Sequence, residues 1–211
     1  MTPPHDADTP MPALDEHDLS PDPFQQFTVW YQAAVGSDLP EPSAMTLATA
    51  SADGRPSARI VLLKTYDRRG FVFHTNYQSR KAIEMAKNPY AALVWFWQPL
   101  HRQIRIEGAV ERISGDESDA YFASRPRAAQ LGAAISAQSG GVENRAEILA
   151  RFEQLRRESE GKDVARPSNW GGLRVAPLAF EFWQGRDDRL HDRFRYTLHP
   201  DGTWQIERLW P

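Results

Sequence analysis

Residues 45–75 read MTLATASADGRPSARIVLLKTYDRRGFVFHT, and this stretch decides the fold class. Three runs carrying threonine, valine, isoleucine, leucine and phenylalanine are separated by the short polar segments ADG and RRG. Runs of this composition, bounded by turn residues, indicate β-strands joined by tight turns. Strands linked so closely pair antiparallel, because a parallel pair needs a much longer crossover connection.

Further strands and helices are expected on both sides of this stretch. Asp22 can cap a helix that has Pro23 at its first position, Ser114 and Glu117 form a capping box, and Gly161 can stop a helix. The expected helices are 23–35, 79–88, 114–125 and 144–160, and the expected further strands are 90–97, 102–114, 173–185, 189–198 and 203–210. Hairpin-linked strands with inserted helices predict an α+β protein whose antiparallel sheet closes into a barrel.

Length and composition exclude several classes of protein. The chain has 211 residues, which suits one domain, and its net charge of −3 argues against a general nucleic-acid binder. It has no cysteine, so disulfides and thiolate metal sites are excluded, and the longest apolar run, 90–97, is too short to span a bilayer. Residues 1–21 lack a secretory signal pattern and are expected to be disordered, followed by a single domain over 22–211. We expect a cytoplasmic protein.

A cluster of basic residues occurs at 189–195, which read RLHDRFR. If this segment is a β-strand, Arg189, His191, Arg193 and Arg195 project from one face, since side chains alternate along a strand. Such a face cannot belong to an apolar core, so we expect it to meet a ligand or a partner.

A second basic cluster lies where a helix should begin, in the sequence SRK. Ser79 is a plausible N-cap, which places Arg80 and Lys81 in the first helical turn. Cations there are unfavourable beside the positive end of the helix dipole, but they suit a bound anion such as a phosphate. The alternative is a pair of solvated surface cations.

Two weaker signals point in the same direction. Arg59 and Lys64 occur in the strand RIVLLK, and Tyr121 and Arg125 share a helix face at i and i+4. Each pair also has an ordinary explanation, as snorkelling side chains or surface packing. In a chain of negative net charge, four such sites together indicate binding of two anions, such as two phosphate-bearing ligands. The sequence contains no nucleotide-binding glycine motif and no metal-binding histidine spacing.

Several short motifs follow one another in the order found in a known enzyme family. They are RIVLLK, TN..SRK, RQ at 102–103, YF.SRPR at 121–127, QS at 138–139, WGG at 170–172, EFWQG at 181–185 and RLHDR at 189–193. On these motifs, the chain from about residue 22 to 211 resembles the pyridoxamine (pyridoxine) 5′-phosphate oxidases. These are flavoenzymes with the FMN-binding split-barrel fold. The resemblance therefore implies an α+β protein built on a split β-barrel of mostly antiparallel strands with peripheral helices.

The resemblance also implies an activity. Pyridoxamine 5′-phosphate and pyridoxine 5′-phosphate would be oxidised to pyridoxal 5′-phosphate in vitamin B6 biosynthesis or salvage. Hydride would pass from substrate C4′ to flavin N5, and O2 would reoxidise the flavin to give H2O2, with ammonia released from the amine.

Site residues are implied in the same way. Residues of the FMN site, with the basic ones at its phosphate, would be Arg59, Ile60, Val61, Leu62, Lys64, His74, Thr75, Arg80, Lys81, Gln103, Gln138, Ser139, Trp183 and Arg193. The substrate phosphate would be held by Lys64, Tyr121 and Arg125, while Arg189 and His191 would contact the substrate at the flavin and act in catalysis. Family members are homodimers with FMN at the interface, so these residues need not all come from one chain. No metal, nucleic acid or membrane is implied.

The sequence departs from the family pattern in two places. Ala129 stands where members commonly have a serine that binds the substrate phosphate, and no R-x-E-Y-like lid segment is found in residues 1–21. Three alternatives stay open, and these two departures favour the last of them. One is a related split-barrel FMN oxidase of phenazine-type precursors, another is a flavin reductase of this class, and the third is a non-catalytic carrier of FMN or pyridoxal phosphate.

Overall fold

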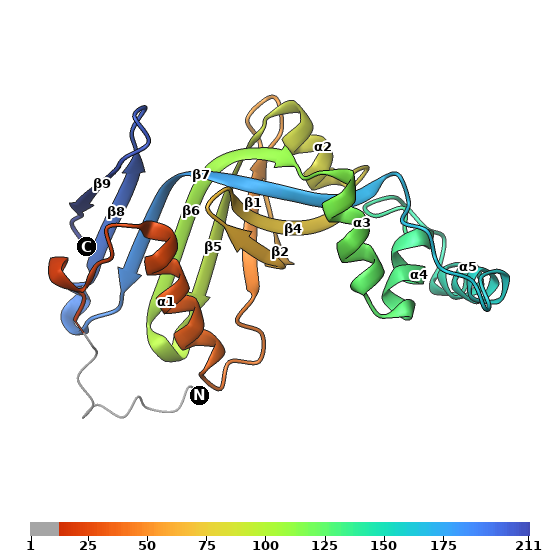
Figure 1. Ribbon diagram of the computed structural model, residues 1–211, viewed down its shortest axis with the longest axis horizontal. Coiled ribbons are helices and arrows are strands. Elements are labelled where there is room, and N and C mark those ends of the chain that lie inside the picture. Colours follow the sequence, from red (N-terminus) through yellow and green to blue (C-terminus); the bar gives the residue numbers. More distant parts are fainter. Residues whose placement is uncertain (1–12) are drawn as a thin grey trace.

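A computed structural model of the chain describes residues 13–211 (Figure 1). Its strands form one antiparallel sheet in the order β2-β1-β5-β6-β7-β4-β3, and β8 and β9 continue from β7. The strands are β1 (Ala44–Ala50), β2 (Pro56–Leu62), β3 (Thr65–Asp67), β4 (Gly70–Asn76), β5 (Tyr90–Trp97), β6 (Arg102–Arg112), β7 (Trp170–Gln184), β8 (Asp192–Leu198) and β9 (Trp204–Arg208). The predicted α+β class with an antiparallel sheet is confirmed.

Strand β7 organises the sheet because its two halves have different partners. Its first half pairs with β4 and its second half with β8, while β6 runs along both halves. The register of β6 against β7 shifts between Glu107 and Gly108. A Cβ atom at Gly108 would lie 2.1 Å from the carbonyl oxygen of Ala176, so only glycine allows the two strands to approach at this bulge. The bulge bends the sheet and separates β4 from β8.

Five α-helices accompany the sheet within the described residues. They are α1 (Pro23–Val35), α2 (Arg80–Lys87), α3 (Gly115–Ser124), α4 (Arg127–Ile135) and α5 (Arg145–Glu158). Helix α1 crosses the concave side of the sheet in front of β5 and β6, whereas α3, α4 and α5 project from one end of the molecule (Figure 1). Strands β8 and β9 lie at the opposite end (Figure 1).

The core lies between α1 and the sheet. Asp22 caps α1 by accepting a hydrogen bond from the backbone N–H of Phe24, as predicted. The buried ring of Phe27 packs edge-on against Phe71 at 4.7 Å and Trp95 at 5.2 Å between ring centres. Buried aromatic rings supply large apolar areas and favour this edge-to-face geometry, so α1 is anchored on β4 and β5.

Three expectations about secondary structure were wrong. Helix α4 follows Pro126 directly, although no helix was expected over 127–135; Pro126 stands just before the helix with a ψ of 140°, where its missing N–H removes no helical hydrogen bond. Strand β8 begins at Asp192, so Arg189 and His191 are not part of it. Residues 13–21, expected to be disordered, pack on the C-terminal strands. Residues 1–12 lie outside the described part of the chain.

The packing of residues 13–21 has an identifiable cause. Arg208 on β9 donates hydrogen bonds to Glu16 and Asp15, and the hydroxyl group of Tyr196 donates to the carbonyl oxygen of Ser20. Leu14 is buried. The residues joined by these hydrogen bonds are more than 170 positions apart in the sequence, so no local sequence pattern could predict the contacts. Within residues 13–211, no helix is long and apolar enough to cross a membrane.

Candidate active site

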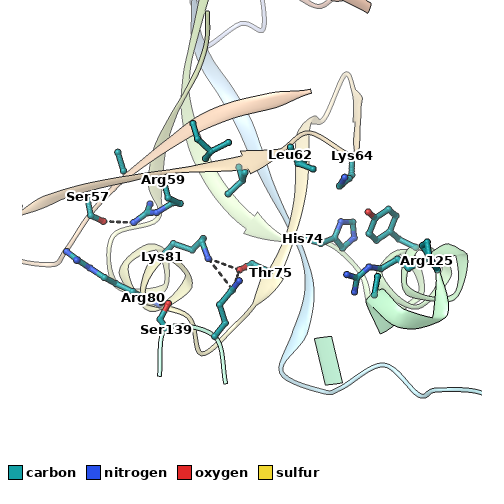
Figure 2. A pocket seen from close by; sticks show the side chains of 17 residues that line it. Ser57, Arg59, Leu62, Lys64, His74, Thr75, Arg80, Lys81, Arg125 and Ser139 are labelled. Atoms are coloured by element: carbon teal, nitrogen blue, oxygen red, sulfur yellow. Dashed lines mark hydrogen bonds between the residues drawn. The ribbon is translucent and has the colours of Figure 1, made fainter. Parts of the chain in front are cut away.

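A cavity of about 830 Å³ opens between β2, β4 and the N-terminus of α2 on one side and α3 and α4 on the other (Figure 2). Its volume lies in the range typical of small-molecule sites. Thirteen of the residues expected at the FMN and substrate sites line it. They are Arg59, Ile60, Val61, Leu62, Lys64, His74, Thr75, Arg80, Lys81, Tyr121, Arg125, Gln138 and Ser139. The structure thus brings together motifs that are up to 80 residues apart in the sequence.

One half of the cavity, which we call the first subsite, surrounds the start of α2 (Figure 2). Ser79 precedes the helix as predicted, but its hydroxyl group caps no backbone N–H. The backbone N–H of Arg80 instead donates to the hydroxyl oxygen of Ser139 at 3.2 Å. The ammonium group of Lys81 donates to Thr75 Oγ1 and Gln138 Oε1, both at 3.1 Å. This arrangement places backbone amides and cations together, as an anion site requires.

Burial changes the ionisation of Lys81. Burial of its ammonium group lowers the pKa of Lys81, and the neighbouring charge of Arg59 lowers it further. An anion bound beside Lys81 and Arg59 would favour the charged form of Lys81. The electrostatics of the first subsite therefore favour a ligand with negative charge.

Glu84 lies behind the first subsite, outside the cavity lining, and sequence reasoning missed it. It lies one turn after Arg80 on α2, and its carboxylate accepts hydrogen bonds from Arg80, Thr49 and Ser57. Burial of the carboxyl group acts to raise the pKa of Glu84, but these hydrogen bonds outweigh burial and lower it to about 2. The i, i+4 spacing from Arg80 was the available signal, and it is also the commonest spacing of surface ion pairs.

The other half of the cavity, the second subsite, contains Lys64, His74, Tyr121 and Arg125 (Figure 2). The His74 ring stacks on Tyr121 at 3.9 Å and on Trp170 at 5.2 Å between ring centres. The guanidinium carbon of Arg125 lies 4.8 Å from the centre of the Trp170 ring. Aromatic faces of this kind hold a guanidinium group in place while leaving its N–H donors available.

Unpartnered nitrogen atoms mark the second subsite as a place for a ligand. Arg125 Nη1 and both ring nitrogens of His74 are buried and have no hydrogen-bond partner among residues 13–211. Burial lowers the pKa of His74 to about 4, and the charges of Arg125 and Lys64 act in the same direction. His74 is therefore neutral at pH 7. A buried guanidinium donor without a partner is costly, and an anion bound here would satisfy it.

The depressed pKa of His74 makes stability depend on pH. Between its folded pKa of about 4 and its ordinary value of 6.5, the unfolded chain binds more protons, so acidification favours unfolding. We expect His74→Phe to reduce the loss of unfolding free energy between pH 6.5 and pH 4 by up to about 1.4 kcal/mol per pH unit, measured by urea unfolding. The exposed His199 offers a control for the loss of one histidine, His199→Gln, which should change the profile less than His74→Phe does. Identical profiles for His74→Phe and the parent protein would contradict this assignment.

Five expected site residues lie outside this cavity and form a separate group. They are Gln103, Trp183, Arg189, His191 and Arg193. Gln103, Trp183 and Arg193 are neighbours across β6, β7 and β8, and the His191 ring lies 4.7 Å from that of Trp183. We call this set the C-terminal group.

The C-terminal group lies far from the cavity along β7. Trp170, the first residue of this 15-residue strand, lines the second subsite, whereas Trp183 is its next-to-last residue. At about 3.3 Å per residue, the strand between them spans roughly 40 Å of extended chain. Figure 1 shows the same separation, with β8 at one end of the molecule and α3 and α4 at the other. One chain does not bring both sets of residues to one ligand.

The loop before β8 holds Arg189 and His191 in a defined conformation. Arg189 has a φ of 62°, which is unusual for a residue other than glycine. His191 Nδ1 accepts a hydrogen bond from the backbone N–H of Arg186 at 3.1 Å, which closes the loop. The prediction that four basic residues share a strand face is therefore wrong, because this turn interrupts the extended chain. Arg193 pairs with Glu181, and Arg195 pairs with Glu207.

Two family models match consecutive parts of the chain. The model described as pyridoxamine 5′-phosphate oxidase matches residues 32–158, and the one described as the pyridoxine 5′-phosphate oxidase C-terminal dimerisation region matches residues 170–211. The first contains every residue of the cavity apart from Trp170, and the second contains Trp170 and most of the C-terminal group.

Similar proteins carry matching names. Pyridoxine/pyridoxamine 5′-phosphate oxidase of Cupriavidus necator is 56% identical over 199 residues, covering 94% of this chain and 93% of that protein. The protein of the same name from Trichormus variabilis is 52% identical over 204 residues, covering 97% and 95%.

Solved structures share the fold. That of PhzG from Burkholderia lata, in complex with tetrahydrophenazine-1-carboxylic acid, has a TM-score of 0.90 at 29% identity and covers 96% of this chain and 100% of that one. A pyridoxamine 5′-phosphate oxidase-related, FMN binding protein from Nostoc punctiforme has a TM-score of 0.72 at 20% identity, covering 92% and 100%.

Proposed function

The chain belongs to the pyridoxamine 5′-phosphate oxidase family, and from that membership we propose how its residues divide the work of the reaction. It is an FMN-dependent split-barrel oxidase of pyridoxine 5′-phosphate and pyridoxamine 5′-phosphate. The product is pyridoxal 5′-phosphate, with H2O2 from O2 and ammonia from the amine substrate. The enzyme is a homodimer, and the C-terminal part of the chain is its dimerisation region.

The residues of the cavity fit FMN and a phosphorylated substrate. The first subsite offers Arg59, Arg80 and Lys81 at a helix N-terminus, and the second offers Lys64 and the unpartnered Arg125. Two separate anion sites in one cavity match one phosphate on the cofactor and one on the substrate. This pairing of subsites is the observation that carries the proposal.

We assign the first subsite to the FMN phosphate. Ser139 and Gln138 already contact Arg80 and Lys81 there, so these side chains would bind the phosphate as one group. Residues 60–62 of β2 line the cavity between the two subsites and would lie along the flavin ring. When bound, FMN supplies the hydride acceptor at N5 and passes the electrons on to O2.

We assign the second subsite to the substrate phosphate. Lys64, Tyr121 and Arg125 would donate to it, with Arg125 held by its contact with the Trp170 ring. Ala129 lines both parts of the cavity and offers no hydroxyl group, so this chain binds the phosphate with one donor fewer than the family pattern. A lost hydrogen bond of this kind weakens substrate binding by about 1 kcal/mol.

The C-terminal group completes the site from the second chain. In the homodimer, the partner subunit's Gln103, Trp183 and Arg193 would cover the FMN bound in the cavity. The partner subunit's Arg189 and His191 would then contact the substrate. The separation of the two groups along β7 and the position of the dimerisation region support this arrangement.

The loop geometry suggests what Arg189 and His191 do. Because Nδ1 of His191 accepts a backbone hydrogen bond, the neutral ring carries its proton on Nε2 and can donate it to a substrate oxygen or nitrogen. Arg189 is exposed and would place a fixed positive charge beside the pyridine ring of the substrate. This charge would orient the substrate and favour its anionic form. Both residues would act on the substrate, while the phosphate subsites keep it in place.

One assay tests the proposed function. Purified protein supplied with FMN, pyridoxine 5′-phosphate and air should form the aldehyde, seen by its absorbance, with one H2O2 for each aldehyde. A phenazine-type oxidase or a non-catalytic carrier would bind flavin without forming the aldehyde. A single domain over residues 22–211 and a cytoplasmic location stay predictions; limited proteolysis and cell fractionation test them.

A further inference from the structure

Glu84 lies beneath the first subsite and has no role in the assignments above. Its side chain is only 8% exposed, and its carboxylate joins three elements of the fold. Oε1 accepts a hydrogen bond from Arg80 Nε at 2.8 Å on α2. Oε2 accepts from Thr49 Oγ1 at 2.5 Å on β1 and from Ser57 Oγ at 2.6 Å on β2. A buried charge with this many partners is kept in one position.

Arg59 reaches the same carboxylate by three routes. Its Nη2 lies 3.3 Å from Glu84 Oε2, and it also donates to the Ser57 hydroxyl oxygen at 2.5 Å (Figure 2). Its Nη1 donates to Thr49 Oγ1 at 2.6 Å. Each hydroxyl group thus accepts from the guanidinium and donates to the carboxylate, which fixes the direction of the network. Arg59 and Arg80 are two cations held on one anion.

The charges of the subsite match those of a phosphate monoester. Arg59, Arg80 and Lys81 contribute three positive charges, and the ionised Glu84 leaves the group with a net charge of +2. A phosphate monoester carries about −1.5 to −2 at pH 7. Without Glu84, three cations would face one another in the flavin-free protein. Within residues 13–211, the terminal nitrogens of Arg80 have no other partner and stay available to a ligand.

We propose that Glu84 is a positioning residue for the FMN phosphate, which holds Arg59 and Arg80 in place before FMN binds and adjusts the subsite charge to that of the phosphate. It does so through the two arginines and without touching the ligand. This inference rests on the proposed assignment of the first subsite to FMN. It deepens that assignment, because it makes phosphate selectivity depend on a residue outside the contact surface.

Binding of FMN compared with riboflavin tests the inference. Riboflavin lacks the phosphate, so a positioning role affects the two ligands differently, whereas a purely structural role affects them alike. The full chain is freed of flavin and titrated with each ligand by flavin fluorescence. Glu84→Gln should weaken FMN about tenfold or more, because the neutral amide keeps one acceptor oxygen and no charge with which to hold both arginines, and should change riboflavin less than about twofold.

Three further variants sharpen the test. Glu84→Asp keeps the charge and should recover part of the FMN selectivity that Glu84→Gln loses. Thr49→Val removes one hydroxyl bridge between Arg59 and Glu84, keeps every charge and lies outside the cavity lining; it should cause a smaller loss in the same direction. Glu153→Gln, an exposed position on α5, is the matched control and should bind both flavins like the parent protein. If Glu84→Gln does not fold, Thr49→Val decides the question.

Any other binding result for these variants would contradict a specific part of the proposal. Tighter FMN binding by Glu84→Gln would mean that the carboxylate only repels the phosphate, and equal losses for FMN and riboflavin would mean that it is only structural. Unchanged binding of both would also overturn the inference. If the parent protein did not prefer FMN to riboflavin, or if Lys81→Ala kept that preference, the assignment of the subsite would fail instead.

Discussion

Arg189→Ala should retain FMN and lose about a hundredfold or more in kcat/KM for pyridoxine 5′-phosphate. The guanidinium is exposed on a loop closed by His191 and held at a positive φ, away from the cavity of its own chain. In the homodimer it would meet the substrate, so its removal takes an orienting charge from the reacting complex and not from the cofactor. Steady-state kinetics and the ratio of flavin to protein absorbance measure the two effects separately.

Neighbouring residues of the same segment supply the controls. Arg195 is paired with Glu207 on the exposed side of β8, and Arg195→Ala should have nearly normal kinetics and flavin content. Arg193→Ala should instead lower flavin occupancy, and His191→Ala should keep the flavin with a smaller loss than Arg189→Ala. If Arg189→Ala oxidised the substrate like the parent protein, this loop would not be part of the substrate site.

Replacement of both Arg80 and Lys81 by alanine should weaken FMN at least tenfold while riboflavin binding changes little. Each side chain would contribute a charge-assisted hydrogen bond of roughly 1.5–3 kcal/mol to the phosphate, and riboflavin has no phosphate to lose. Fluorescence titration of the flavin-free chain with both ligands measures the difference. Arg151→Ala together with Arg156→Ala, on the exposed face of α5, removes the same number of charges and controls for net charge.

If Arg80 and Lys81 do not bind the phosphate, the double variant should behave differently. If Arg80 and Lys81 were solvated surface residues, the double variant would bind both flavins like the parent protein. If they were structural, both ligands would lose affinity equally. Their hydrogen bonds to Glu84, Thr75 and Gln138 argue against the first of these outcomes.

Local patterns in the sequence predicted most of the secondary structure. The capping residues Asp22 and Ser114 begin helices as expected, because capping depends on contacts within a few residues. The start of α2 at Arg80 was predicted for the same reason, because Ser79 marks it locally. The helix after Pro126 was missed because a proline that ends one helix is equally suited to precede the next.

Contacts between distant residues could not be predicted in this way. The role of Glu84 depends on Thr49 and Ser57, which reach it only because β1, β2 and α2 meet in the fold. The separation of the C-terminal group from the cavity depends on the path of β7 through the fold. The order of motifs along the sequence does not reveal that path. The strand assigned to residues 189–191 was wrong because a backbone hydrogen bond to His191 outweighs the alternating pattern.

We propose that each active site combines the cavity of one chain with Arg189 of the other. Arg125→Ala impairs the cavity, and Arg189→Ala impairs the loop, so each homodimer should have low kcat/KM. When the two variants are coexpressed, random pairing makes half of the dimers mixed, and each mixed dimer has one intact site. The mixture should therefore recover about a quarter of the parent activity. Activity no higher than that of the two separate homodimers would contradict it, because sites made within one chain cannot be restored by mixing.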